Sequence, residues 1–273
     1  MDRIQIEESE LAYRRQGSGE WIVFSHCGMI ATGFVPISND RRLSSFGRLT
    51  YHRRGQGESS HPKGVVTTFD HARDLQGLMR ALGIERAHVV GHSFGGSIAI
   101  QLAIQAPELI QTLTICDPAV TNLPLPNAEQ FLESATAIQA RYDCGDKQGA
   151  FDDFMSARVG PGWRETIDRE LPEGTYEQGL KDVDRWFQCD VPGVRQWSSE
   201  VSDDDIKALD CRILRVTGTN SVSIHQEVYA LLGRWWPNSE PLILEGANHF
   251  GPVDMPDQFV PVLADFVGGH PIY

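Results

Sequence analysis

The sequence predicts an α/β fold with a mostly parallel, eight-stranded sheet, helices on both of its faces and one helical insertion. Short apolar runs rich in Val, Ile, Leu and Thr alternate with helical patterns over most of the chain. This alternation is typical of parallel strands joined by crossover helices. The runs carry few polar residues, as expected where helices cover both faces of a sheet. A more charged, helical stretch interrupts the alternation between residues 121 and 205.

The strands are predicted in chain order. The opening segments RIQIEE and LAYRRQG are typical of a hairpin at a sheet edge. Six further runs are rich in β-branched or aliphatic residues, and with the hairpin they complete the predicted sheet. They span residues 21–26, 46–52, 86–92, 110–117, 211–218 and 240–246.

Helices are predicted between the strands from apolar residues that recur at helical spacing. The segment 67–84 has such an apolar stripe and a stop signal at Gly83. A second helix begins directly after Ser93, and two more are predicted over 225–237 and 257–269.

The chain divides into two predicted domains. Residues 1–120 and 206–273 form the α/β core, and residues 121–205 form a helical domain inserted over the strand ends. The insertion contains three helical patterns and no convincing strand, so it departs from the rhythm of the core.

Composition limits the partners and the compartment. A formal net charge of −13 over 273 residues argues against nucleic acid or an anionic membrane, because both are bound by clustered Lys and Arg. The five cysteines have neither zinc-site nor disulfide-framework spacing, so we expect reduced thiols and no metal site. The first residues lack a secretory-signal profile and no apolar run reaches the length of a membrane span, so a cytoplasmic location is expected.

The stretch VVGHSFGGS, residues 89–97, places Ser93 between glycines directly after an apolar run. The pattern G-x-S-x-G is informative where a strand precedes it and a helix follows it, as predicted here. The glycines allow a tight turn that lifts the hydroxyl clear of the sheet, and amides at the start of the next helix stabilise an anion. We interpret Ser93 as a nucleophile; the alternative is an idle serine in a glycine-rich turn.

A serine nucleophile needs a positioned base. Of the nine histidines, His249 follows the last predicted strand at a glycine-containing turn. Loops after parallel strands meet at one edge of a sheet, so His249 is the best-placed partner for Ser93. The alternative is a solvated surface histidine.

These motifs resemble those of the α/β-hydrolase family. GHSFGG (91–96) resembles the family's nucleophile elbow and GANHF (246–250) its histidine loop. FSHCG (24–28) and YHRRGQGES (51–59) resemble its HG loop and its D-x-R-G-x-G-x-S turn. The resemblance implies the α/β-hydrolase sheet, with the insertion over 121–205 as the helical cap.

The resemblance also implies a triad acid, which many members carry just after the penultimate strand. Here that turn reads VTGTNSVSI, and Ser221 stands at the expected position. Asp117 ends the strand after the nucleophile's helix, where some members carry the acid, and the order nucleophile, acid, base is kept. The alternative role for Asp117 is a turn cap before proline. Glu227 and Asp254 remain alternative acids.

An oxyanion hole of two backbone N–H groups is implied as well. One belongs to Phe94, directly after the nucleophile. The other lies in the HG-type loop, where matching His26 to the family's histidine makes Gly28 the expected donor and Cys27 the alternative.

Apolar residues near these positions and in the insertion are candidates for substrate binding, although an aromatic residue at helical spacing is more often part of a core. The candidates are Met29, Phe154, Trp186, Phe187 and Phe250.

The favoured function is a serine hydrolase that cleaves small or medium apolar carboxylic esters or lactones through an acyl-enzyme on Ser93. No metal and no organic cofactor are implied, the expected partner is a small-molecule substrate, and the oligomeric state stays open. One alternative is a cofactor-independent dioxygenase or peroxidase, whose oxygen consumption would survive Ser93→Ala. The other is a non-catalytic protein that binds a small ligand and shows stabilisation by ligand without product.

Overall fold

A single mixed sheet organises the chain, and its central strands are parallel. The computed structural model describes residues 1–61, 63–120 and 125–272. The strand order is β1-β2-β4-β3-β5-β6-β7-β8; β1 and β2 run antiparallel to their neighbours and the other pairings are parallel. The strands are β1 (Asp2–Ile6), β2 (Ser9–Gln16), β3 (Trp21–Ser25), β4 (Gly47–Tyr51), β5 (Ala87–His92), β6 (Ile110–Cys116), β7 (Arg212–Gly218) and β8 (Glu240–Leu244).

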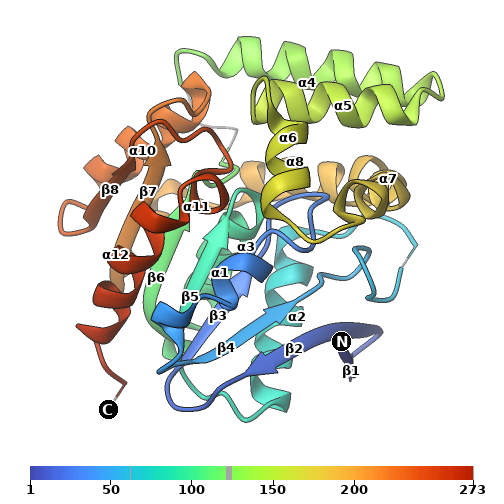
Figure 1. Ribbon diagram of the computed structural model, residues 1–273. Coiled ribbons are helices and arrows are strands. Elements are labelled where there is room, and N and C mark those ends of the chain that lie inside the picture. The colour runs from blue at the N-terminus through green and yellow to red at the C-terminus, as the bar shows by residue number, and fades with distance from the viewer. Residues whose placement is uncertain (62, 121–124, 273) are drawn as a thin grey trace.

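Helices cover both faces of this sheet (Figure 1). One apolar cluster joins the sheet to α2, α3 and α10, and a second joins it to α1 and α12. The helices outside residues 128–200 are α1 (Val35–Ser38), α2 (Thr68–Ala81), α3 (Phe94–Gln105), α9 (Asp203–Lys207), α10 (Ser223–Trp235), α11 (Gly251–Asp254) and α12 (Pro256–Gly268), with 3-10 turns η1 (Arg41–Leu43) and η2 (Pro107–Leu109).

The predicted fold class is confirmed. Each of the six predicted runs contains one strand, and the opening hairpin is β1 and β2. The start of α2 follows from its sequence: the Thr67 hydroxyl accepts from the Asp70 N–H while the Asp70 carboxylate accepts from the Thr67 N–H, which satisfies two otherwise free amides. The short helices α1, α9 and α11 were not predicted, because four or five residues show no helical period.

Residues 128–200, called the helical segment below, lie beyond the carboxyl ends of the parallel strands. Figure 1 shows α4 and α5 at the top of the molecule, with α6, α7 and α8 nearer the sheet. Its elements are α4 (Ala128–Asp143), α5 (Lys147–Arg158), α6 (Trp163–Glu170), α7 (Thr175–Arg185), the π-helical turn η3 (Trp186–Asp190) and α8 (Val191–Glu200). The predicted start of the insertion, residues 121–124, lies outside the described residues, so its limits stay a prediction.

The helical segment shares its packing with the core. Trp197 of α8 is fully buried, and its indole N–H donates to the Gln101 side chain of α3 (2.8 Å). Phe151 and Trp186 belong to the same apolar cluster as the sheet residues. The segment is therefore fixed over the strand ends by continuous apolar contact.

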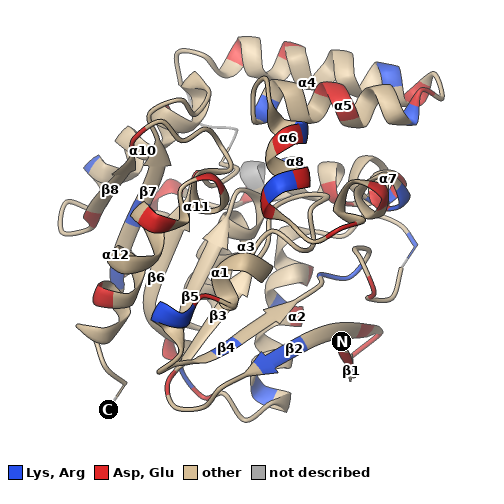
Figure 2. Ribbon diagram, in the orientation of Figure 1, with Lys and Arg blue, Asp and Glu red and all other residues tan. Residues whose placement is uncertain are grey.

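Charge is kept away from the centre of the sheet. Strands β3, β5 and β6 contain no Lys, Arg, Asp or Glu, and Figure 2 shows the charged residues mainly on the outer helices and loops. Among the described residues, no helix is long and apolar enough to cross a membrane.

Candidate active site

Ser93 occupies a strained turn between β5 and α3. Its φ of 54° and ψ of −120° are unusual for a residue with a side chain, and its N–H donates to the Cys116 carbonyl of β6 (2.9 Å). The turn also requires glycine at 95, because a Cβ there would lie 2.0 Å from the Ser25 carbonyl oxygen of β3. The turn thus places Ser93 at the carboxyl end of β5, where Ser93 lines a pocket.

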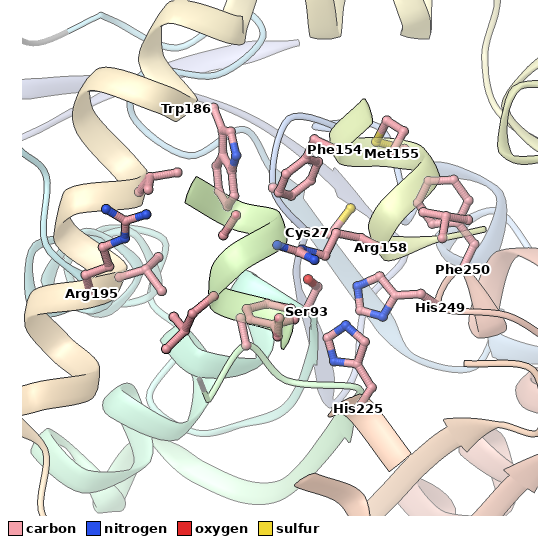
Figure 3. A pocket seen from close by; sticks show the side chains of 18 residues that line it. Cys27, Ser93, Phe154, Met155, Arg158, Trp186, Arg195, His225, His249 and Phe250 are labelled. Carbon is pink, nitrogen blue, oxygen red and sulfur yellow. The ribbon is translucent and has the colours of Figure 1, made fainter. Parts of the chain in front are cut away.

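His249 and Asp117 meet at the same edge of the sheet. His249 Nδ1 lies 3.3 Å from Asp117 Oδ2, and both side chains are buried. With its proton on Nδ1 donated to the carboxylate, the imidazole keeps an Nε2 lone pair free to accept a proton. Figure 3 shows the ring beside Ser93. The structure therefore brings together all three side chains that the sequence singled out.

Ser221 supports the carboxylate. Its hydroxyl donates to Asp117 Oδ2 (2.6 Å) and accepts from the Gly218 N–H (3.2 Å). Asp117 has a positive φ of 41°, and its N–H donates to the Val216 carbonyl (3.1 Å). The residue at the usual acid position thus holds the carboxylate that comes from the neighbouring strand.

The alternative acids lie elsewhere in the fold. Glu227 of α10 accepts from the Asn127 N–H (3.1 Å) and ties α10 to the start of α4. Asp254 of α11 interacts with Thr166 of α6, and burial raises its pKa. Neither carboxylate is bonded to His249 within the described part of the chain, in contrast to Asp117.

Two further histidines surround His249. His92 Nε2 donates to the His249 carbonyl (2.7 Å), and burial together with the nearby His249 lowers the pKa of His92 to about 3. His225 of α10 stacks on His249 with ring centroids 4.0 Å apart and an interplanar angle of 10°. Burial, reinforced by His249, holds the pKa of His225 well below its usual value. His225 was not among the predicted site residues, because a histidine on an amphipathic helix carries no signal that it faces a site.

The two amides expected to form the oxyanion hole, those of Gly28 and Phe94, have no hydrogen-bond acceptor within the described residues. Gly28 lines the same pocket as Ser93, and the Trp186 ring lies against it. Cys27 also lines the pocket, but burial raises the pKa of its thiol to about 12, so it stays protonated and is a poor nucleophile.

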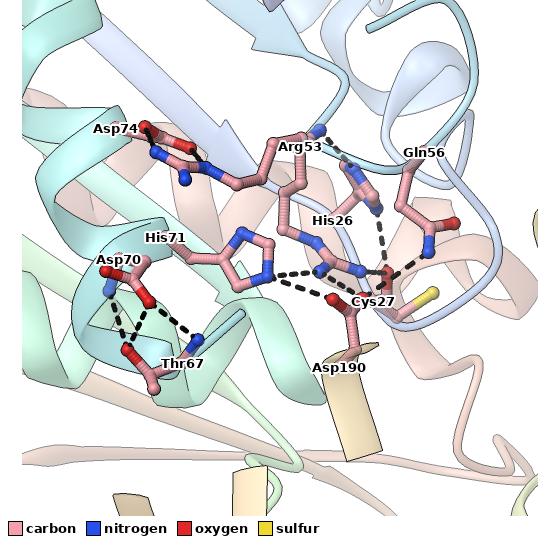
Figure 4. Close-up of polar contacts among 10 residues, drawn as sticks. His26, Cys27, Arg53, Gln56, Thr67, Asp70, His71, Asp74 and Asp190 are labelled. Carbon is pink, nitrogen blue, oxygen red and sulfur yellow. Dashed lines mark hydrogen bonds and ion pairs between the residues drawn. The ribbon is translucent and has the colours of Figure 1, made fainter. Parts of the chain in front are cut away.

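A buried polar network holds the loop after β3, which contains Cys27 and Gly28 (Figure 4). The Arg53 N–H donates to His26 Nε2 (3.1 Å), so His26 carries its proton on Nδ1 and donates it to the Cys27 carbonyl (2.7 Å). The Arg53 guanidinium donates to the same carbonyl (3.1 Å) and to Asp190 Oδ2 (2.9 Å). Asp190 ends η3 and also accepts from His71 (3.1 Å). The network links the loop after β3 to the helical segment.

The substitution Gly28→Ala should lower kcat/KM about 10²-fold, because a Cβ would lie 2.6 Å from two ring atoms of Trp186 and displace the amide. Ester turnover under initial-rate conditions is the measurement. Gly33→Ala, in the same loop region, is the matched control. A Cβ at this position would lie 3.4 Å from its nearest neighbour, the Ile30 carbonyl oxygen, and would fit without a clash. Equal activity of both variants and the wild type would contradict a role for the Gly28 amide.

The pocket at Ser93 encloses about 110 Å³ and is mostly apolar. Phe154, Trp186 and Phe250, three of the predicted substrate-binding candidates, line it. Met29 and Phe187, the other two predicted substrate-binding candidates, are not among the lining residues. Met29 is buried in the core, and Phe187 stacks on Tyr142 of α4 (centroids 4.7 Å apart). Local sequence could not show which face of each segment meets the pocket.

The described residues contain no cluster of three or more His, Cys, Asp or Glu side chains suited to a metal ion.

Comparison with known proteins agrees with this geometry. The family described as "alpha/beta hydrolase fold" matches residues 28–256. The chain is 25% identical to 2-(acetamidomethylene)succinate hydrolase of Mesorhizobium japonicum over 97% of this chain and 94% of that protein. It is 24% identical to 2-hydroxymuconate semialdehyde hydrolase of Pseudomonas putida over 88% of this chain and 82% of that protein.

Solved structures share the fold. The enol-lactonase from Burkholderia xenovorans LB400 superposes with a TM-score of 0.78 at 21% identity, covering 97% of this chain and 99% of that one. The family match covers most of the sequence and includes strands β4 to β8 of the sheet and the strained turn at Ser93. The chain belongs to the α/β-hydrolase family.

Proposed function

We propose that this protein is a serine hydrolase of small or medium carboxylic esters or lactones that acts through an acyl-enzyme on Ser93. The observation that carries the proposal is the convergence of Ser93, on its strained turn, with the buried His249–Asp117 pair at one pocket. Relatives named as hydrolases, and structural neighbours named as an enol-lactonase and as an N-acyl homoserine lactone degrading enzyme, support hydrolysis and include lactone chemistry.

In the first step His249 Nε2 takes the proton of the Ser93 hydroxyl while Oγ attacks the substrate carbonyl carbon. Asp117 holds His249 in the required tautomer and stabilises its charged form. The Gly28 and Phe94 amides hold the negative oxygen of the tetrahedral intermediate. His249 then gives its proton to the leaving alcohol, and the C–O bond breaks.

In the second step a water molecule takes the place of the serine hydroxyl. His249 accepts a proton from the water, the resulting oxygen attacks the acyl carbon, and Ser93 leaves with the proton returned by His249. An ester gives a carboxylic acid and an alcohol, and a lactone gives a single hydroxy acid.

Incubation with a fluorophosphonate tests the proposal directly. We expect intact-mass analysis to show rapid addition of one phosphonyl group, mapped to Ser93, and no addition in Ser93→Ala. A screen of short-chain esters and lactones then defines turnover. Absence of labelling in the folded wild type would reject the activated serine. Oxygen consumption that survives Ser93→Ala would instead favour the cofactor-independent oxygenase.

A further inference from the structure

The pocket at Ser93 has a charge opposite to that of the protein. The chain carries a formal net charge of −13, yet none of the described residues that line this pocket is Asp or Glu. The fully charged side chains in its lining are Arg158 and Arg195. An acidic protein with a cationic pocket favours an anionic ligand at that place.

Arg158, the last residue of α5, is the buried cation of the pair. Its side chain is 7% exposed, and within the described residues no Asp or Glu oxygen lies within 4.0 Å of it. Its contacts are aromatic: the guanidinium carbon lies 3.8 Å from the Phe131 ring centroid and 5.6 Å from that of Phe154. Stacking uses the faces of the guanidinium and leaves its in-plane N–H donors free.

The comparison with Arg53 shows how unusual this is. Arg53 is fully buried, but Asp190 balances its charge at 2.9 Å. Burial lowers the pKa of Arg158 to about 10, with no neighbouring carboxylate to raise it, so the group is still a cation at neutral pH. A buried cation without a partner is unfavourable in the free protein, and an anionic ligand would relieve that cost.

Arg158 also lies close to the reacting groups. Figure 3 shows its guanidinium pointing into the pocket on the side of Ser93 and His249. Its charge contributes to the lowered pKa of His225, which stacks on His249. Both His225 ring nitrogens lack a partner within the described chain. A ligand that reaches Ser93 therefore lies close to the Arg158 guanidinium in the same pocket.

We infer that Arg158 binds a carboxylate carried by the substrate, so that the esters or lactones cleaved at Ser93 are monoanions and not neutral molecules. This inference rests on the proposed hydrolase function. One planar guanidinium matches the single charge and the two oxygens of a carboxylate. The apolar remainder of the lining contacts the carbon chain between that carboxylate and the scissile bond.

Matched substrates test the inference. Mono-4-nitrophenyl glutarate and 4-nitrophenyl pentanoate differ in a terminal carboxylate against a methyl group. We expect the wild type to favour the anion about 10- to 100-fold in kcat/KM, and Arg158→Met to lower kcat/KM for the anion to the level of the neutral ester. Arg164→Gln, which removes a half-exposed arginine of α6, should retain the preference. Esters of 3-hydroxypropanoate place the carboxylate on the alcohol side and show which half of the substrate carries it.

Stability separates ligand binding from a structural role. Because Arg158→Met removes an unpaired buried charge and keeps an apolar stem, the free variant should melt at or above the wild-type temperature. A clear fall in Tm together with an unchanged preference for the anion would indicate that the arginine serves packing alone and would overturn the inference. Arg158→Lys, which keeps the charge but not the fork, should retain part of the preference.

Binding to Ser93→Ala keeps this inference separate from the hydrolase proposal. Calorimetry should show monomethyl glutarate binding at least tenfold more tightly than methyl pentanoate, with the difference lost in Ser93→Ala/Arg158→Met. Arg158-dependent binding without turnover in the wild type would reject the hydrolase and keep the carboxylate site. Serine-dependent turnover without preference for the anion would do the reverse.

Discussion

Asp117→Asn should lower kcat/KM for a carboxylic ester by about 10⁴-fold and leave the fold intact. An amide at this position either leaves His249 Nδ1 without an acceptor or favours the wrong tautomer, and it cannot neutralise the imidazolium that forms when Ser93 loses its proton. An asparagine side chain would still reach His249 Nδ1, which lies 3.3 Å from Asp117 Oδ2, but it would carry no negative charge. Initial rates, together with the rate of fluorophosphonate labelling, measure the loss.

The matched controls are the two other carboxylates near this end of the sheet. Glu227→Gln and Asp254→Asn should change kcat/KM by less than about threefold, since Glu227 binds Asn127 and Asp254 interacts with Thr166. Wild-type rates in Asp117→Asn, or a large loss in either control, would assign the acid to another residue.

Arg53→Met should lower the free energy of unfolding by about 3–5 kcal/mol, because it leaves the Asp190 carboxylate buried without its cation. Both side chains are at most 1% exposed, and they are 2.9 Å apart. Burial opposes ionisation of Asp190, but the Arg53 charge and His71 outweigh it and hold the pKa of the carboxyl below its usual value. Urea unfolding followed by circular dichroism measures the change.

Two further variants show whether the loss comes from the stranded charge. Arg53→Met/Asp190→Leu should recover much of the stability, since an apolar pair replaces a buried ion pair at little cost. Arg42→Met, which breaks the more exposed pair with Asp40, should cost less than about 1 kcal/mol. If the Arg53 and Arg42 variants unfold alike, the buried network does not stabilise the fold as described.

The core of the fold was predictable because its signals are local. Each parallel strand is a short apolar run, and the glycines near Ser93 indicate a tight turn there. The meeting of Asp117 and His249 could be predicted too, since the ends of parallel strands converge regardless of their separation in the chain.

The remainder depends on packing between distant helices. The position of His225 follows from how α10 lies on β7, and the isolation of Arg158 is a property of everything around it. The burial of Met29 and Phe187 has the same origin: both are apolar and near the site in sequence, and only packing decides that they are buried. Such packing between distant segments leaves no periodic pattern in the local sequence.

The hydrogen bond between Ser221 and Asp117 shows how close the side chains at the ends of β6 and β7 lie, with the two oxygens 2.6 Å apart. A carboxylate introduced at position 221 would lie directly beside Asp117, and two adjacent acids share a proton. In Ser221→Asp one of the two carboxyls would therefore stay protonated, and the site would not gain a second full negative charge.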